Sequence, residues 1–301
     1  MEKKIIIAGG SGFVGKALTA FLLKKNYSVI VLTTNKKLVS KTDHVEFVYW
    51  NPEENEIATT LKFENYIVIN LAGANVAKGR WTENRKKEIL ESRVKPILFL
   101  KKLHQEKRIN ITYFISASAI GFYGLTENFC DENTFGDNSF LSETCQKWEH
   151  AADEIKNLGV PTSILRLGIV LGKNEGALPS LIQSLNFKVA AIPSNGNQIM
   201  SWIHINDVVK MFFHLIEKKQ VGIFNAVAPN PISYNVLFKE IKKLKSFWML
   251  FHIPVWFLKI VLGEFATELT KSTKVSSKKI EDLGFQFEFP IIEDAFEELN
   301  K

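Results

Sequence analysis

KIIIAGGSGFVG, residues 4–15, is the stretch that decides the fold of this 301-residue chain. Residues 5–8 form an unbroken apolar run that stops at glycine, which is typical of a strand buried on both faces of a parallel sheet. Gly9, Gly12 and Gly15 follow at G-x-x-G-x-x-G spacing. Apolar residues then recur at helical intervals of three and four: Val14, Ala17, Leu18 and Phe21. The stretch therefore predicts a central strand, a glycine turn and a helix, in that order.

This order of elements is the one that a dinucleotide-binding site needs. Glycine has no β-carbon, so the backbone can turn tightly and come close to a pyrophosphate. Free N–H groups at the start of the helix carry partial positive charge, which attracts phosphate. The glycines alone also fit a plain strand-to-helix turn, so the flanking strand and helix are what favour a cofactor site. The predicted phosphate-binding residues are Gly9, Gly12, Phe13, Val14 and Gly15.

A second buried strand is predicted at 28–33, and its end should meet the adenosine ribose. The residues there are Thr33, Thr34, Asn35 and Lys36, with no carboxylate among them. A carboxylate that binds both ribose hydroxyls selects NAD, whereas hydroxyl, amide and ammonium groups suit a 2′-phosphate. NADP(H) is therefore the favoured cofactor and NAD(H) the alternative. The same lysine also fits a loop that merely faces solvent.

The rest of the chain alternates predicted strands with predicted helices. Strands are expected at 45–50, 66–71, 113–116, 162–167 and 222–225, and helices at 82–104 and 141–158. Such alternation without an internal repeat predicts an α/β fold with a doubly wound parallel sheet of the Rossmann type. We expect a domain over 1–228, in which 173–205 contribute to the substrate side, and a small, mostly helical C-terminal lobe over 229–301.

Composition and charge narrow the function classes. The chain is 46% hydrophobic and 23% charged, near globular averages, and its net charge is +6. Its lysines are spread in short pairs, which favours a solvated surface over a nucleic-acid interface. Cys130 and Cys145 have no metal-like spacing, so the sequence predicts no metal site and reduced thiols in a cytoplasmic protein. The first strand begins within four residues, which leaves no room for a signal peptide.

One apolar stretch, FWMLFHIPVWFLKIVLG at 247–263, resembles a membrane segment. It is shorter than a spanning helix and contains His252, Pro254 and Lys259. We expect a pair of helices packed on the domain and no membrane span, with shallow membrane contact as the alternative.

Small and hydroxyl-bearing residues follow the fourth and fifth strands. Leu71, Ala72 and Gly73 leave room for a ligand against the backbone, so they are expected to form a second cofactor wall that continues into the substrate side at Ala74. After the fifth strand, hydroxyls that follow the carboxyl end of a parallel strand point into the ligand crevice. Ser116 is assigned to the cofactor, and Ser118 and Tyr123 to the chemistry.

Several further motifs together resemble one known family. They are GGSGFVG (9–15), NLAGANV (70–76), RWT (80–82), SRV (92–94), SASAIGFYG (116–124), WE (148–149), LRLGIVLG (165–172), SWIHINDV (201–208) and NAVAPNP (225–231). The chain resembles extended short-chain dehydrogenase/reductases over its whole length, and within them the epimerase-like subgroup of the NAD-dependent epimerase/dehydratase family. The resemblance implies a Rossmann fold, an NAD(P) cofactor contacted also by Arg93, and a small, sugar-nucleotide-like substrate.

The resemblance also implies a catalytic set that this chain lacks in part. Such enzymes use a Ser or Thr after the fifth strand and a Tyr-x-x-x-Lys pair on the next helix, where the lysine lowers the tyrosine pKa. Ser118 matches the serine, but with 148–149 as register marker the other two positions fall on Leu141 and Cys145. Lys147 is about 200° round the helix from Cys145 and cannot substitute for the missing lysine. Tyr123 is then the candidate proton donor, or else a structural tyrosine.

The substrate side is assigned to Ala74, Arg166, Trp202 and His204. Arg166 lies on a buried strand, so its charge must meet a carboxylate or a phosphate. His204 fits either a ligand contact or a hydrogen-bonded packing residue. Relatives generally carry an arginine where this chain has Thr33-Thr34-Asn35, and a glycine pair where it has Ala190-Ala191.

Two functions remain open on the sequence. The first is an NADP(H)-dependent oxidoreductase or epimerase-like enzyme that acts on a small molecule. The second is a catalytically inactive NADP(H)-binding sensor or partner-binding module, because the Tyr-x-x-x-Lys pair is missing. Whether two copies form a homodimer is also left open.

Overall fold

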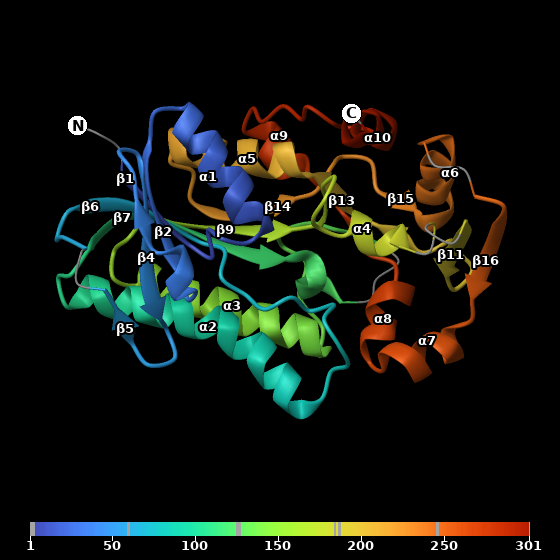
Figure 1. Ribbon diagram of the computed structural model, residues 1–301, viewed down its shortest axis with the longest axis horizontal. Coiled ribbons are helices and arrows are strands. Elements are labelled where there is room, and N and C mark those ends of the chain that lie inside the picture. Colours follow the sequence, from blue (N-terminus) through green and yellow to red (C-terminus); the bar gives the residue numbers. More distant parts are fainter. Residues whose placement is uncertain are drawn as a thin grey trace.

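One parallel sheet runs through the molecule. The computed structural model describes residues 4–58, 61–124, 128–183, 185, 188–244 and 247–300. Seven parallel strands lie in the order β4 (Val45–Asn51), β2 (Ser28–Thr33), β1 (Lys4–Ala8), β6 (Asn65–Asn70), β7 (Asn110–Ala119), β9 (Thr162–Leu167) and β14 (Gly222–Ala226) (Figure 1). The short strands β3 (Ser40–Lys41) and β5 (Glu56–Ile57) pair antiparallel with β4. The connection direction reverses between β1 and β6, the place where this sheet type opens a ligand crevice.

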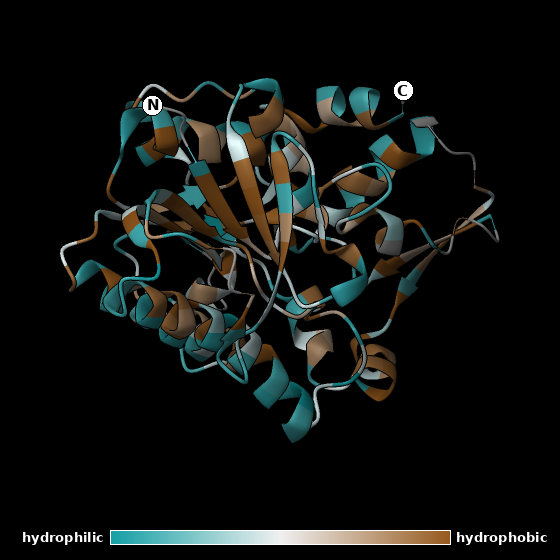
Figure 2. Ribbon diagram, turned by 60° about the vertical axis from the view of Figure 1, so that its left-hand side comes forward, coloured by the Kyte–Doolittle hydropathy of each residue, from teal (hydrophilic) through white to brown (hydrophobic). Residues whose placement is uncertain are grey.

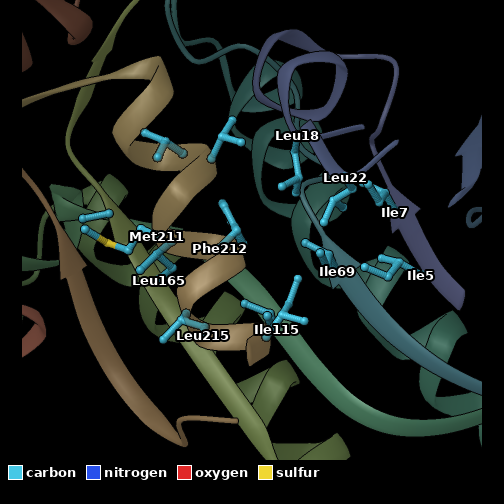
Figure 3. Close-up of a cluster of buried hydrophobic side chains, with 14 of the residues drawn as sticks. Ile5, Ile7, Leu18, Leu22, Ile69, Ile115, Leu165, Met211, Phe212 and Leu215 are labelled. Atoms are coloured by element: carbon cyan, nitrogen blue, oxygen red, sulfur yellow. The ribbon is translucent and has the colours of Figure 1, made fainter. Parts of the chain in front are cut away.

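Helices cover both faces of the sheet. α1 (Phe13–Lys24) and α5 (Ile205–Lys218) lie on one face, and α2 (Glu83–Gln105) and α3 (Phe140–Lys156) on the other (Figure 1). Ile5 and Ile7 point into the first core, beside Leu18 and Phe212 (Figure 3). The intervening Ile6 packs in the second core, against α2 and α3. Strand β1 is thus buried on both faces, and the predicted doubly wound α/β fold is confirmed.

The hydropathy of the ribbon follows this layering. Hydrophobic residues are concentrated in the central strands, and much of the helical surface is hydrophilic (Figure 2). β7 begins at Asn110 and continues to Ala119, several residues beyond the predicted span on each side. The extension carries Ser118 within a strand that pairs with β9, rather than in a loop.

The remaining elements are short segments of the Rossmann half or parts of a smaller lobe. They are η1 (Lys36–Leu38), η2 (Ile120–Tyr123), β8 (Phe129–Cys130), β10 (Ile169–Leu171), α4 (Leu178–Leu181), β11 (Val189–Pro193), β12 (Ile199–Met200), β13 (Trp202–His204), β15 (Ile232–Ser233), α6 (Tyr234–Leu244), β16 (Met249–Ile253), α7 (Val255–Leu262), α8 (Phe265–Thr270), β17 (Lys274–Val275), α9 (Lys278–Asp282) and α10 (Ile292–Asn300). A third hydrophobic core draws residues from 171–202 and from 228–299. The proposed division at residue 228 therefore separates chain segments that share this core.

The expectation of a helix pair at 247–263 is wrong for its first half. Met249–Ile253 is strand β16, which pairs in parallel with β11, and only α7 after Pro254 is helical. The partner strand lies some sixty residues earlier, so local apolarity could not distinguish this strand from a helix. Among the described residues, no helix combines the length and apolar character that a membrane crossing requires.

A buried carboxylate ties the C-terminal segment to α5. Asp207 is fully buried in the first turn of that helix. Its two oxygens accept hydrogen bonds from the backbone N–H groups of Glu288 (2.7 Å) and Phe289 (3.0 Å). The chain thus returns from the smaller lobe to the Rossmann half just before α10.

Candidate cofactor and substrate site

The glycines of the first turn serve two different needs. Gly9 has φ +77°, and a β-carbon there would lie 2.7 Å from the backbone nitrogen of Ala72. A β-carbon on Gly15 would lie 2.5 Å from the α-carbon of Gly10. A β-carbon on exposed Gly12 would meet only the carbonyl of Gly9, at 3.3 Å. The chain's own packing therefore requires Gly9 and Gly15, while Gly12 borders space that the protein leaves open.

The start of α1 faces that space without a cap. Gly12 is the N-cap residue, no side chain accepts from the first N–H groups, and the first turn contains no acidic residue. These N–H groups and the partial positive charge of the helix end remain available to an anion. The turn thus has the free N–H groups and the open space that the pyrophosphate of a dinucleotide cofactor requires.

The end of β2 is organised by its own side chains. Thr33 is buried, and its hydroxyl accepts a hydrogen bond from the N–H of Asn35 at 3.1 Å. Asn35 Oδ1 accepts from the N–H of Lys37 at 3.0 Å, and the ammonium of Lys36 lies 4.6 Å from the ring centre of Tyr49. Thr34 is exposed. This turn therefore presents a hydroxyl, an amide and lysines, and no carboxylate.

The loop after β6 is braced from behind by α2. Asn70 is fully buried at the strand end, and its Nδ2 has no hydrogen-bond partner in the described part of the chain. The N–H of Ala74 donates to Ser92 Oγ at 2.9 Å, and Arg93 Nη2 donates to the Ala74 carbonyl at 3.1 Å. Leu71 and Ala72 are half-buried, and Gly73 is exposed. Arg93 thus holds the backbone of the predicted second wall.

Ser116 and Ser118 are two residues apart on β7 and therefore lie on the same face. Ser116 is fully buried and donates to the carbonyl of Ala117 at 2.9 Å. Ser118 is also buried, and its hydroxyl donates to Glu149 Oε1 at 2.6 Å. The Ser118 proton is therefore committed to a carboxylate, which leaves the oxygen lone pairs to accept a bond from another group.

A buried network continues from that carboxylate. Glu149, on α3, is bound at both oxygens by Arg166, from Nε and Nη2, each at 2.8 Å. Arg166 Nη1 donates to the Tyr123 hydroxyl at 2.9 Å, and that hydroxyl donates to Asn225 Oδ1 at 2.6 Å. The side chains of this hydrogen-bonded network are all buried: Ser118, Glu149, Arg166, Tyr123 and Asn225.

This network determines what its members can do. The charge of Arg166 is neutralised by a carboxylate; the sequence had left a carboxylate and a phosphate open as partners. The Arg166 guanidinium also lies 3.5 Å from the ring centre of Phe122. The Tyr123 hydroxyl already makes two hydrogen bonds, and burial raises its pKa to about 12. A ligand could reach Tyr123 or Arg166 only by displacing an existing partner. Glu149 and Asn225 were not assigned a role from the sequence, although both lie in motifs that the resemblance used.

Leu141 and Cys145 lie on α3 against η2. A β-carbon on Gly121 would be 3.3 Å from Leu141 Cβ and 3.9 Å from Cys145 Sγ, so the helix and the 3-10 turn are closely packed. Burial raises the pKa of the Cys145 thiol to about 11, which keeps it neutral at physiological pH. Lys147 is exposed on the same helix.

Trp202 and His204 are packing residues of the smaller lobe. Both are buried, and Trp202 Nε1 donates to the carbonyl of Asn230 at 2.9 Å. His204 Nδ1 accepts from the N–H of Asn206 at 3.2 Å, which caps α5, and its ring centre lies 4.1 Å from that of Phe289. Burial lowers the pKa of His204 to about 4, so the ring is neutral. Among the described residues, no group of three His, Cys, Asp or Glu side chains could hold a metal ion.

The buried ion pair generates a first prediction. Glu149→Ala leaves the Arg166 guanidinium buried without its carboxylate, which should lower the free energy of unfolding by about 3–5 kcal/mol. The double variant Glu149→Leu/Arg166→Met removes both charges and should recover about 2 kcal/mol of that loss. Urea denaturation measures both. As a control, Glu154→Ala breaks the partly exposed pair with Lys101 and should cost at most about 1 kcal/mol. A double variant as unstable as Glu149→Ala would contradict this account.

His204 generates a second prediction, on pH. Its folded pKa of about 4 lies below the ordinary value of 6.5, so as pH falls the unfolded chain takes up the proton first. The contribution to stability is complete above pH 6.5 and is lost between about 6.5 and about 4, in all about 3 kcal/mol. His204→Asn keeps an acceptor for the Asn206 N–H and should flatten this loss in urea denaturation across that range. Equal curves for wild type and His204→Asn would refute the assignment.

Comparison with known proteins places the chain in a family. The profile described as "NAD dependent epimerase/dehydratase family" matches residues 5–227, and a "Domain of unknown function (DUF1731)" matches 253–299. The epimerase family protein YfhF of Bacillus subtilis is 32% identical over 298 residues, which cover 98% of this chain and 97% of that protein. An Arabidopsis thaliana protein, "Epimerase family protein SDR39U1 homolog, chloroplastic", is 30% identical over 98% of this chain and 86% of its own length.

Solved structures share the fold. The human epimerase family protein SDR39U1 (isoform 2) with NADPH has a TM-score of 0.83 at 24% identity, and the match covers 99% of each chain. UDP-glucuronic acid 4-epimerase of Bacillus cereus, in complex with UDP-glucuronic acid and NAD, has a TM-score of 0.81 at 20% identity over 98% of this chain and 96% of its own. With its glycine turn, its sheet order and these matches, the chain belongs to the NAD-dependent epimerase/dehydratase family, among the extended short-chain dehydrogenase/reductases.

Proposed function

We propose that this protein binds NADP(H) and acts as an epimerase-like or oxidoreductase-like enzyme on a small, sugar-nucleotide-like substrate, without a Tyr-x-x-x-Lys pair. The observation that carries the proposal is the open space beside Gly12, at the uncapped start of α1. A nicotinamide cofactor bound there supplies hydride transfer. The relatives named above support the cofactor class, since one solved structure is described with NADPH and another with NAD.

Different segments of the chain would hold different parts of the cofactor. Residues 9–15 would bind the pyrophosphate, and Thr34, Asn35 and Lys36 the 2′-phosphate, which favours NADP(H) because the turn contains no carboxylate. Residues 71–73 would form the wall opposite the glycine turn, with Arg93 bonded to the carbonyl of Ala74 directly after them. Ser116, on the neighbouring strand β7, would be the last residue on the cofactor side of the crevice.

Ser118 is the residue to which we assign contact with the reacting group. Its proton is held by Glu149, so the oxygen is oriented to accept a hydrogen bond from a substrate hydroxyl. Tyr123 would act as proton donor only after its bond to Asn225 is exchanged for one to the substrate. Leu141 and Cys145 supply neither a proton donor nor a cation, which is why we expect slow turnover.

A second function is favoured by the same network. If Tyr123 and Arg166 keep their present partners, the chain would bind NADP(H) and report its presence without catalysis. The engagement of both side chains and the neutral thiol of Cys145 support this alternative. A cytoplasmic location, a homodimer, Ala74 as a substrate contact and the division at residue 228 remain part of the proposal.

Cofactor binding is tested by two glycine variants that should differ. Gly12→Val fills the space expected for pyrophosphate and should abolish NADPH binding with an unchanged circular dichroism spectrum and melting temperature. Gly9→Val should also lower the melting temperature, because its side chain would collide with the backbone of residues 71–72. Titration by cofactor fluorescence gives the affinity. Unchanged NADPH affinity in Gly12→Val would reduce the motif to a structural turn.

Cofactor preference is tested at the end of β2. We expect tighter binding of NADPH than of NADH by the wild type. Thr34→Asp introduces a carboxylate at an exposed position, and its repulsion of the 2′-phosphate should weaken NADPH binding by about tenfold or more while NADH binding is retained. Asn133→Asp, which adds the same charge at another exposed site, should change neither affinity. Equal or tighter NADH binding by the wild type would overturn the preference.

Catalysis is tested by turnover with NADP(H) on nucleotide sugars, alcohols and ketones. The absence of a positioned acid should keep rates low, since such a group is worth about 10²–10⁴ in rate. Ser118→Ala and Tyr123→Phe should each lower the remaining rate, whereas Cys145→Ala should have little effect. Tight NADPH binding with no turnover on any substrate would favour the sensor. Turnover that survives the first two variants and vanishes in Cys145→Ala would exclude the proposed role of Ser118.

A further inference from the structure

The smaller lobe exposes a concentrated apolar surface on β16 and α7. Nineteen large hydrophobic side chains are exposed in the described part of the chain, and eight of them fall within residues 248–261. These eight, which we call the β16–α7 surface, are Trp248, Met249, Leu250, Phe251, Trp256, Phe257, Ile260 and Val261. Trp248 is 87% exposed and Trp256 is 64% exposed. A patch of this density on one lobe is typical of a binding surface.

Neither element covers the other's apolar residues. Successive residues of β16 point to opposite faces, yet Leu250 (45%) and Phe251 (50%) are both exposed. On α7, Leu258 is the buried residue, while the exposed residues recur at spacings that share one face. β16 lies at the end of the molecule opposite β6, where it projects from the lobe (Figure 1).

The segment that carries this surface contains basic residues and no acidic ones, while Glu293 and Glu297 of α10 lie near Lys243 on the neighbouring α6. Residues 241–263 contain no Asp or Glu. The nearest carboxylates along the chain are each paired with a lysine: Glu240 with Lys243 (2.6 Å), Glu264 with Lys86 (2.6 Å) and Glu268 with Lys271 (2.5 Å). Lys242 and Lys259 are exposed and have no ion pair in the described part of the chain, and the Lys242 ammonium lies 5.6 Å from the ring centre of Phe247. The segment itself is therefore cationic, with Lys242 and Lys259 as its unpaired exposed charges among the described residues.

We propose that the β16–α7 surface docks this protein on an anionic membrane surface, with Trp248 and Trp256 at the level of the lipid headgroups. Tryptophan prefers that region because its ring is apolar and its N–H is polar. Exposed lysines beside the apolar residues add attraction to anionic lipid. The proposal does not depend on the proposed function.

A bilayer fits this surface better than a second protein does. A fluid phase can surround a projecting strand that is apolar on both faces, whereas a folded partner would need a groove that covers both. The insertion is shallow, because β16 pairs with β11 alone among the described strands and its outer backbone groups need water or headgroup oxygens. The tryptophans therefore lie at the interface and not in the hydrocarbon core.

Vesicle sedimentation of the full chain tests the proposal. We expect binding to phosphatidylcholine vesicles that contain phosphatidylserine, weaker binding to phosphatidylcholine alone, and weakening by salt. Trp256→Glu and Trp248→Ser should each reduce binding, the first by about tenfold or more. Lys242→Gln and Lys259→Gln should each reduce it by about fivefold on anionic vesicles only. Phe135→Glu, at a 92% exposed residue outside this surface, should bind as the wild type does.

Circular dichroism and the melting temperature, both expected to match the wild type, show that these exposed variants remain folded. Absence of binding to anionic vesicles, or binding that Trp256→Glu and Trp248→Ser leave intact, overturns the proposal. So does sedimentation velocity without lipid, if it shows a concentration-dependent dimer that Trp256→Glu abolishes while the wild type fails to bind vesicles. In that case the occupant of the surface is a second copy.

Discussion

The buried charge of Arg166 is the constraint on which the part of this structure around Ser118 and Tyr123 depends. A guanidinium inside a sheet is costly unless it is paired at good geometry, and Glu149 supplies both oxygens for it. That one requirement ties β9 to α3, and through the remaining N–H it also ties both to η2 at Tyr123. Ser118 is oriented as a consequence, since its proton goes to the carboxylate already committed to Arg166. The side chains that hold this part of the fold together are therefore the same ones that the proposed chemistry would use.

The two halves of the site differ in how far the protein has filled them. At the cofactor half, Gly12 and the uncapped start of α1 border space, and the N–H groups there have no competing side chain. At the other half, Arg166 is bonded to both Glu149 and Tyr123, and the Tyr123 hydroxyl also donates to Asn225. The N–H groups at the start of α1 are thus open to an anion in this structure, whereas proton transfer through Tyr123 would need an exchange of hydrogen bonds. An open cofactor site beside a fully bonded Tyr123 fits a slow enzyme as well as it fits a sensor.

The smaller lobe is held to the larger by specific polar contacts and not by apolar packing alone. Asp207 fixes residues 288–289 to the start of α5, and His204 packs on Phe289 at the same place. The motif over 201–208, in which Trp202 and His204 were predicted to face the substrate, thus also joins the two lobes. The smaller lobe also carries the exposed apolar residues of β16 and α7.

The sequence by itself determined the Rossmann sheet, the glycine turn and the absence of a carboxylate after β2, because each depends on neighbouring residues and on local periodicity. It also determined that Arg166 had to meet an anion. Only the tertiary structure decided which one, because Glu149 and Arg166 are seventeen residues apart and Asn225 lies on another strand. The same limit explains residues 249–253, where an apolar run fits a helix or a strand and the pairing with β11 decides. Contacts between distant segments are set by how the elements pack, and no local pattern contains that information.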